Sequence, residues 1–277
     1  MCLYIDMKVH LTWPIGNSKF FIESSKFLIS SASGLGAYFT IFIEDKNRKV
    51  VDKKLENIAE IISYTNKNGY RNAWDNMPKW DVVPKSEIVL GLDSDILFVN
   101  KDLAMKFINK SLIKKSIIGT IAYEPAISNF EWKNLFLKYN LPKDDFCFKH
   151  GNGQKGPVYV NNGAILIPSL LLEEFKYCLR KWIKILSKTD YEKNYFFTQI
   201  ATTLALKDSQ INFTPAPVNF NYLESNLHNK KNKTNIEDIA LFHYNMSKLF
   251  VIDDFKKIKF EFSKKILKKF YRPRNLL

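Results

Sequence analysis

The chain has 277 residues, of which 46% are hydrophobic and 25% are charged, and its formal net charge is +14 at pH 7. This length fits one or two domains, and the composition excludes a disordered or coiled-coil protein. No apolar run reaches the ~18–20 residues that a membrane-spanning helix needs, because Asp93, Asp95 and Pro168 interrupt the longest ones. The N-terminus lacks the basic and apolar regions of a secretory signal, and three scattered cysteines do not form a disulfide framework. We therefore expect a cytoplasmic protein.

The positive charge comes almost entirely from lysine, since only five residues of the chain are arginine. Arginine is the residue that nucleic-acid surfaces collect, because its planar guanidinium matches phosphates and base edges. We therefore expect no nucleic-acid partner and interpret most of the lysine excess as solvated surface. An anionic membrane and a phosphate-bearing substrate remain open as partners.

The first half of the chain alternates between strands and helices. Strand character covers 7–13 and is followed by turn residues at 14–16, and a second buried strand covers 38–45. Residues 86–100 form two apolar runs around an acidic centre. The remaining expected elements are helices at 18–30, 51–65 and 103–113 and a strand at 116–124. This order predicts an α/β sheet with helices on both faces.

The second half is less regular. Residues 129–155 mix aromatic and acidic residues with a glycine-containing loop and show no clear period. The elements expected after them are a strand or strand pair at 156–169, helices at 170–188 and 195–206, an extended segment at 212–224 and a short buried strand at 239–245.

Asp93, Ser94 and Asp95 form the first candidate site. Two carboxylates at this spacing offer oxygen ligands to one divalent cation, although the spacing alone is weak as a motif. The apolar runs on both sides place the acids at the edge of a buried sheet. Buried carboxylates need a cation or hydrogen-bond donors, whereas a solvated strand–turn–strand needs neither, and both interpretations stay open.

Three further features lie downstream. His243 follows an apolar run and is either a hydrogen-bonded core residue or a ligand for Mn²⁺. The triplet 161–163 (Asn-Asn-Gly) lies between apolar runs and predicts either a bulge approached by a ligand or a hairpin turn. Gln199 lies within an apolar helical stretch and is either a site residue or a solvent-facing position.

Taken in this order, these features resemble the GT-A fold glycosyltransferases that use nucleotide sugars, most closely those around glycosyltransferase family 8. The matching segments are GLDSDILFVN for the D-x-D motif, NNGAILIP for an N-x-G before a strand, and LFHYN for a strand that ends in His. The resemblance covers roughly residues 8–250. It implies a central mixed sheet with helices on both faces and a divalent cation, Mn²⁺ or Mg²⁺.

The resemblance also implies roles for individual residues. Asp93 would contact the nucleotide ribose and the cation, and Asp95 and His243 would be cation ligands. Gln199 would lie beside the anomeric carbon, with Asp95 as the second catalytic residue. The donor-binding residues would be Thr12, Pro14, Asp45, Arg71, Asp93, Ser94, Asn161, Asn162, Gly163 and Lys248.

The chain departs from the family pattern in two places. Family 8 enzymes carry a Gly and a Lys-Pro-Trp after the last His, whereas this chain reads HYNMSKLFV from His243 onward. The Asp that precedes the helix Gln in the family is replaced here by Thr198. Retention of anomeric configuration is the expectation, with Gln199 as a polar neighbour of an ion-pair intermediate, whereas inversion would need a carboxylate base. The candidates for such a base are Asp190, Glu192 and Glu224.

The last segment differs in character. Residues 253–277 combine an apolar stripe at helical spacing with many lysines. This pattern is typical both of a helix at an anionic membrane surface, using 253–274, and of a terminal helix packed on the domain. We therefore expect a GT-A domain at 1–250 and a basic amphipathic tail at 251–277.

The expected function is transfer of a sugar from a nucleoside diphosphate sugar to a glycan or lipid-linked acceptor, with the protein in the cytoplasm or peripheral at the inner membrane face. A nucleotidyltransferase and a catalytically inactive binding protein of the same fold are the alternatives.

Overall fold

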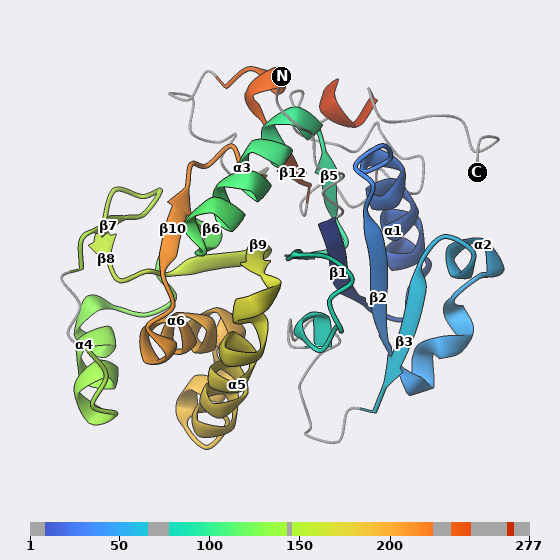
Figure 1. Ribbon diagram of the computed structural model, residues 1–277. Helices are drawn as coiled ribbons and strands as arrows, with labels where there is room; N and C mark the ends of the chain where they lie inside the picture. Colours follow the sequence, from blue (N-terminus) through green and yellow to red (C-terminus); the bar gives the residue numbers. More distant parts are fainter. Residues whose placement is uncertain (1–8, 66–77, 143–145, 224–233, 245–264, 269–277) are drawn as a thin grey trace.

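The computed structural model describes residues 9–65, 78–142, 146–223, 234–244 and 265–268. Its centre is a seven-stranded sheet with the order β10-β6-β9-β4-β1-β2-β3 (Figure 1). β9 runs antiparallel to both of its neighbours, and the other adjacent strands are parallel. The strands are β1 Val9–Ile15, β2 Tyr38–Glu44, β3 Glu60–Tyr64, β4 Ile88–Leu92, β6 Ile117–Ile121, β9 Val160–Pro168 and β10 Phe213–Ala216. The sheet is therefore mixed, as the sequence predicts.

Helices cover both faces of this sheet. Side chains alternate along β4, so that Leu90 and Leu92 join one hydrophobic cluster while Val89 joins the other. The first cluster is covered by α1 (Lys19–Ser31) and α3 (Lys101–Lys114). The second is covered by α4 (Asn129–Lys138), α5 (Ser169–Leu186) and α6 (Phe197–Ser209).

A smaller three-stranded sheet completes the candidate site. Its order is β11-β12-β5, with bounds Asn221–Leu223, Leu241–His243 and Ile96–Phe98. Behind it lies a third cluster of buried side chains, which includes Ile266 and Leu267. One further hairpin pairs β7 (Phe148–Lys149) with β8 (Lys155–Gly156). None of the helices in the described part of the chain has the length and apolar character needed to cross a bilayer.

The prediction of a helix over residues 51–65 is wrong. Only α2 (Lys53–Glu56) is helical, and β3 follows it. The adjacent residues Ile61 and Ile62 fit a helical spacing, but in β3 they pack against opposite faces of the sheet, as neighbours in a strand do. The burial offered by the edge of β2 outweighs the local helical pattern.

Two smaller differences concern the turn at 14–16 and the region after 129. β1 continues through Pro14 to Ile15. Pro14 lies beyond Thr12, the last residue that pairs with β4, and proline is tolerated where a strand has a neighbour on one side only. Helix α4 was not predicted, although Ser128 and Glu131 form a capping box at its start.

Candidate functional site

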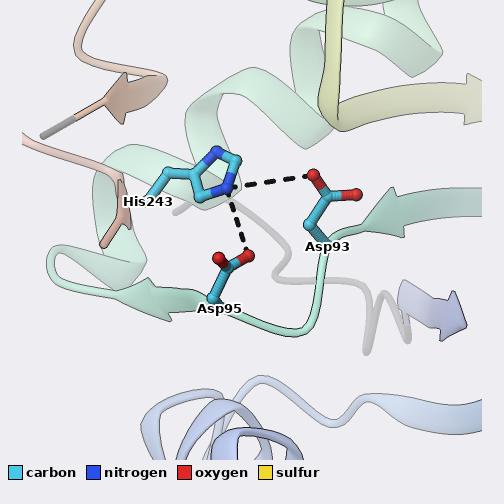
Figure 2. A group of neighbouring side chains, drawn as sticks. All are labelled: Asp93, Asp95 and His243. Atoms are coloured by element: carbon cyan, nitrogen blue, oxygen red, sulfur yellow. Dashed lines mark ion pairs between the residues drawn. The ribbon is translucent and has the colours of Figure 1, made fainter. Parts of the chain in front are cut away.

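Asp93, Asp95 and His243 come together in one cluster (Figure 2). The Nε2 atom of His243 lies 3.1 Å from Oδ1 of Asp95 and 3.8 Å from Oδ2 of Asp93. The candidate ligand atoms of all three residues lie within 4.8 Å of one another. His243 is 6% exposed and Asp95 is 9% exposed, whereas the Asp93 side chain is 30% exposed. The cluster is thus buried on one side and open on the other.

Strand pairing explains this convergence. Asp93 follows β4 and Asp95 precedes β5, so the acids occupy the short connection between the two sheets. β12 pairs antiparallel with β5, and the register places His243 opposite Ile96, the residue after Asp95. The Tyr244 backbone N–H then donates to the Asp95 carbonyl at 3.1 Å. Residues that are far apart in sequence therefore meet because a backbone ladder joins them.

Gly163 in β9 leaves room for the His243 imidazole. The Asp93 backbone N–H donates to the Gly163 carbonyl at 2.9 Å. A Cβ atom at Gly163 would lie 2.8 Å from both Cε1 and Nδ1 of His243. Only a residue without a side chain allows the ring this close to β9.

Lys79 places a buried amine beside the cluster. It lies in a short 3-10 turn, Pro78–Trp80, and its side chain is fully buried. Its Nζ donates to the Asn162 carbonyl at 2.7 Å and lies 3.5 Å from Oδ1 of Asp93. Burial lowers the pKa of the Lys79 ammonium, and the Asp93 carboxylate offsets part of that effect. Lys79 thereby links the end of β4 to β9.

A hydrogen-bond network surrounds the asparagine pair in β9. The Asn161 Oδ1 accepts from the Gly163 backbone N–H at 2.8 Å and from Asn221 Nδ2 at 3.0 Å. The Gln199 Oε1 accepts from the Asn162 backbone N–H at 3.3 Å. Gln199 is 9% exposed and lies in the first turn of α6, so it is not a solvent-facing position, and its role in the site stays a prediction.

The residues present fit a divalent cation. Octahedral ligands at about 2.1 Å from Mg²⁺ are separated by about 3.0 Å when adjacent and about 4.2 Å when opposite. The separations of 3.1 Å and 3.8 Å at His243 Nε2 match this range. Two carboxylates and an imidazole are also a donor set that suits Mn²⁺.

The electrostatics of His243 support the same interpretation. Burial lowers the pKa of His243, but the nearby Asp95 and Asp93 carboxylates outweigh this effect, so that the pKa is raised above its ordinary value. The raised pKa favours a proton on the imidazole beside the carboxylates when no cation is bound. Binding of a cation at Nε2 displaces that proton.

The other predicted donor-binding residues are distributed as follows. Ser94 is buried between the two acids. Thr12 is fully buried, and its hydroxyl donates to the Lys79 carbonyl at 3.1 Å, so it fixes the Lys79 turn. Pro14 lies buried in β1, and Asp45 is exposed just after β2. Arg71 and Lys248 lie outside the described residues. The donor-binding roles of these six residues stay predictions.

Sequence reasoning missed Lys79, Tyr159 and Asn221. The segment before the acidic motif contains both Arg71 and Lys79, and the position of Lys79 between Pro78 and Trp80 is the signal that was available. No pattern in the sequence marks Tyr159, because its hydroxyl contacts Gln199 only through the packing of α6 on β9. Asn221 lies at the start of β11, and its contact with Asn161 depends on how the two sheets meet.

Comparison with known proteins identifies the fold. The galactosyltransferase LgtC in complex with donor and acceptor sugar analogues matches with a TM-score of 0.55 and 14% identity, over 97% of this chain and 98% of that chain. Mouse xyloside xylosyltransferase 1 in its apo form matches with a TM-score of 0.49 and 10% identity, over 87% and 98% of the two chains. No protein-family model and no curated protein sequence matches. The chain has the GT-A fold, as the resemblance in its motifs predicts.

Proposed function

We propose that the protein is a metal-dependent glycosyltransferase, which moves a sugar from a nucleoside diphosphate sugar to a hydroxyl of a surface glycan or lipid-linked acceptor. The observation that carries this proposal is the convergence of Asp93, Asp95 and His243 at the carboxyl end of β4 in a GT-A fold. Ligands of open α/β sheets collect at this edge. A uridine diphosphate donor is favoured, because it is the commoner donor among the enzymes that the chain resembles.

The roles proposed for the residues are those that the family resemblance implies, and the geometry of the cluster supports them. Asp95 and His243 would hold Mn²⁺ or Mg²⁺, with Asp93 shared between the cation and the donor ribose. When bound, the cation neutralises charge on the diphosphate as the glycosidic bond breaks. The network around 161–163 would line the sugar pocket and hold the sugar against Gln199.

We further propose that the reaction retains the anomeric configuration. Gln199, beside the asparagine pair, would be a polar neighbour of the anomeric carbon rather than a base. Of the carboxylates that would suit inversion, Asp190 and Glu192 lie on the 3-10 turn Asp190–Lys193, where Asp190 is exposed and Glu192 is half-buried, and Glu224 lies outside the described residues. Nuclear magnetic resonance of the product anomer tests this proposal, and an inverted product refutes it.

A thermal-shift panel of nucleoside diphosphates, each with and without Mn²⁺, tests the proposed function. One nucleotide should stabilise the protein in a cation-dependent way, by about 2.7 kcal/mol at a concentration of ~100 Kd. Asp95→Ala is the matched variant, and it should abolish the dependence on Mn²⁺. Equal stabilisation with and without the cation would contradict the proposal.

Two alternatives predict different outcomes. A nucleotidyltransferase would release pyrophosphate, whereas sugar transfer releases a nucleoside diphosphate. The glycine-rich phosphate loop of such enzymes does not follow β1, since Gly34 and Gly36 come after α1. A catalytically inactive binding protein would bind the donor without hydrolysing it, both as the wild type and as Asp95→Ala.

Attachment of the 253–274 segment to an anionic membrane at the inner membrane face is a separate proposal. Within the four described residues of this segment, Ile266 and Leu267 are fully buried against the third cluster. Lys265 and Lys268 are exposed beside them. Charge reversal at these two lysines should reduce flotation with anionic liposomes and leave the fold intact, and unchanged flotation would count against membrane attachment through this turn.

A further inference from the structure

We propose that Tyr159 is a positioning residue, which sets the orientation of the Gln199 side chain in the sugar-transfer site. The inference rests on the proposed function, because that function places Gln199 beside the anomeric carbon. Tyr159 lies just before the asparagine pair, and its ring points into the second hydrophobic cluster.

The Gln199 amide is hydrogen-bonded at both of its terminal atoms. Its Oε1 accepts from the Asn162 backbone N–H at 3.3 Å, and its Nε2 donates to the Tyr159 hydroxyl at 3.2 Å. A backbone N–H can only donate, so the atom that faces Asn162 must be the oxygen. The nitrogen therefore faces Tyr159, and the two contacts together fix the plane of the amide.

The Tyr159 hydroxyl is held rigidly and is uncharged. The residue is 1% exposed, and its ring packs at 5.9 Å from the Trp132 ring and 6.2 Å from the His150 ring. Burial raises the pKa of Tyr159 far above its ordinary value, so the hydroxyl stays protonated at all working pH values. A neutral oxygen in a fixed position is a suitable acceptor for the Gln199 amide.

The same segment connects Gln199 to the cation cluster. The carbonyl of Asn162 accepts from Lys79, and Lys79 contacts Asp93. The Oε1 side of Gln199 is thus connected to Asp93 through Asn162 and Lys79. The Nε2 side is held by Tyr159. With both hydrogen bonds made, one N–H and one lone pair of the amide remain for a ligand. Without the hydroxyl, the amide keeps a single contact and can turn about it.

Tyr159→Phe removes the hydroxyl and keeps the ring. It should lower kcat for donor hydrolysis or transfer about tenfold, because the Gln199 amide is then no longer held in one orientation, and leave the Kd for Mn²⁺ with nucleoside diphosphate unchanged. The matched control is Tyr222→Phe, which loses a buried hydroxyl bonded to Thr234 in the third cluster and should keep wild-type kcat. Equal kcat in the two variants would overturn the inference.

A double-mutant cycle separates positioning from general loosening. In the Gln199→Ala background, Tyr159→Phe should cause no further loss of kcat, because the residue acts through the Gln199 amide. A further tenfold loss in that background would show that Tyr159 acts by another route and would refute the proposal.

A spectroscopic readout distinguishes failure of this inference from failure of the proposed function. The side-chain amide resonances of Gln199 can be assigned in ¹⁵N-labelled protein as the pair that disappears in Gln199→Ala. They should shift in Tyr159→Phe and stay in place in Tyr222→Phe. If they shift while the wild type is inactive with every sugar nucleotide, the proposed function fails and the positioning role stands. If they do not shift, the positioning role fails.

Discussion

Gly163→Ala should displace the His243 imidazole and weaken cation binding. The added Cβ would lie 2.8 Å from two ring atoms, whereas ordinary contacts of such atoms begin near 3.4 Å. The ring must therefore retreat by about 0.6 Å, and a binding site tolerates displacements of about 0.5 Å. His243 is 6% exposed and has little free space around it. We expect a loss of Mn²⁺ affinity of at least tenfold, with an overpacking cost of about 1–3 kcal/mol in the free energy of unfolding.

The assay is calorimetric titration of Mn²⁺ into protein saturated with nucleoside diphosphate. Gly119→Ala is the matched control, because its Cβ would lie 2.6 Å from Cγ1 of Val160 in the same sheet and touch none of the proposed ligands. It should lower the melting temperature and keep the Mn²⁺ affinity. If Gly163→Ala binds Mn²⁺ as tightly as the wild type, His243 does not hold the cation in the way proposed.

Two further predictions concern stability. His10 is buried and accepts the Lys85 backbone N–H, while Nε2 contacts the Thr40 hydroxyl at 2.8 Å. Burial lowers the pKa of His10 in the folded protein to about 4, whereas the same imidazole in the unfolded chain binds a proton near pH 6.5. Protonation therefore favours the unfolded chain as the pH falls, and the free energy of unfolding should drop by about 3 kcal/mol between pH 6.5 and 4. Urea denaturation across this range checks this drop, and an equal drop in His10→Asn would contradict it. Gly91→Ala places a Cβ 2.3 Å from the buried Trp80 ring and should cost about 1–3 kcal/mol. Trp80→Phe should recover part of that loss in the double variant, and strictly additive melting data would refute the proposed clash.

The cluster of Asp93, Asp95 and His243 is predictable from the sequence, because each residue adjoins a strong apolar run. Such runs form buried strands, and polar residues at their ends gather at a sheet edge. The resemblance to the GT-A glycosyltransferases, carried by the order of the motifs, is what predicts which ends meet.

Other features depend on packing that no local pattern records. Ile61 and Ile62 fit a helix and a strand equally well, and the free edge of β2 decides between them. Lys79 is a surface residue by type, and its contacts with the Asn162 carbonyl and the Asp93 carboxylate explain its burial. The bond between Tyr159 and Gln199 likewise exists because α6 packs against β9.

Anomalous diffraction from crystals grown with Mn²⁺ and a nucleoside diphosphate tests the central claim most directly. The account predicts one manganese peak bounded by Asp95, His243 and Asp93, with the diphosphate against it. Crystals of Asp95→Ala should lose this peak. A nucleotide bound in the wild type with no manganese at these three side chains, or with the peak elsewhere, would contradict the account.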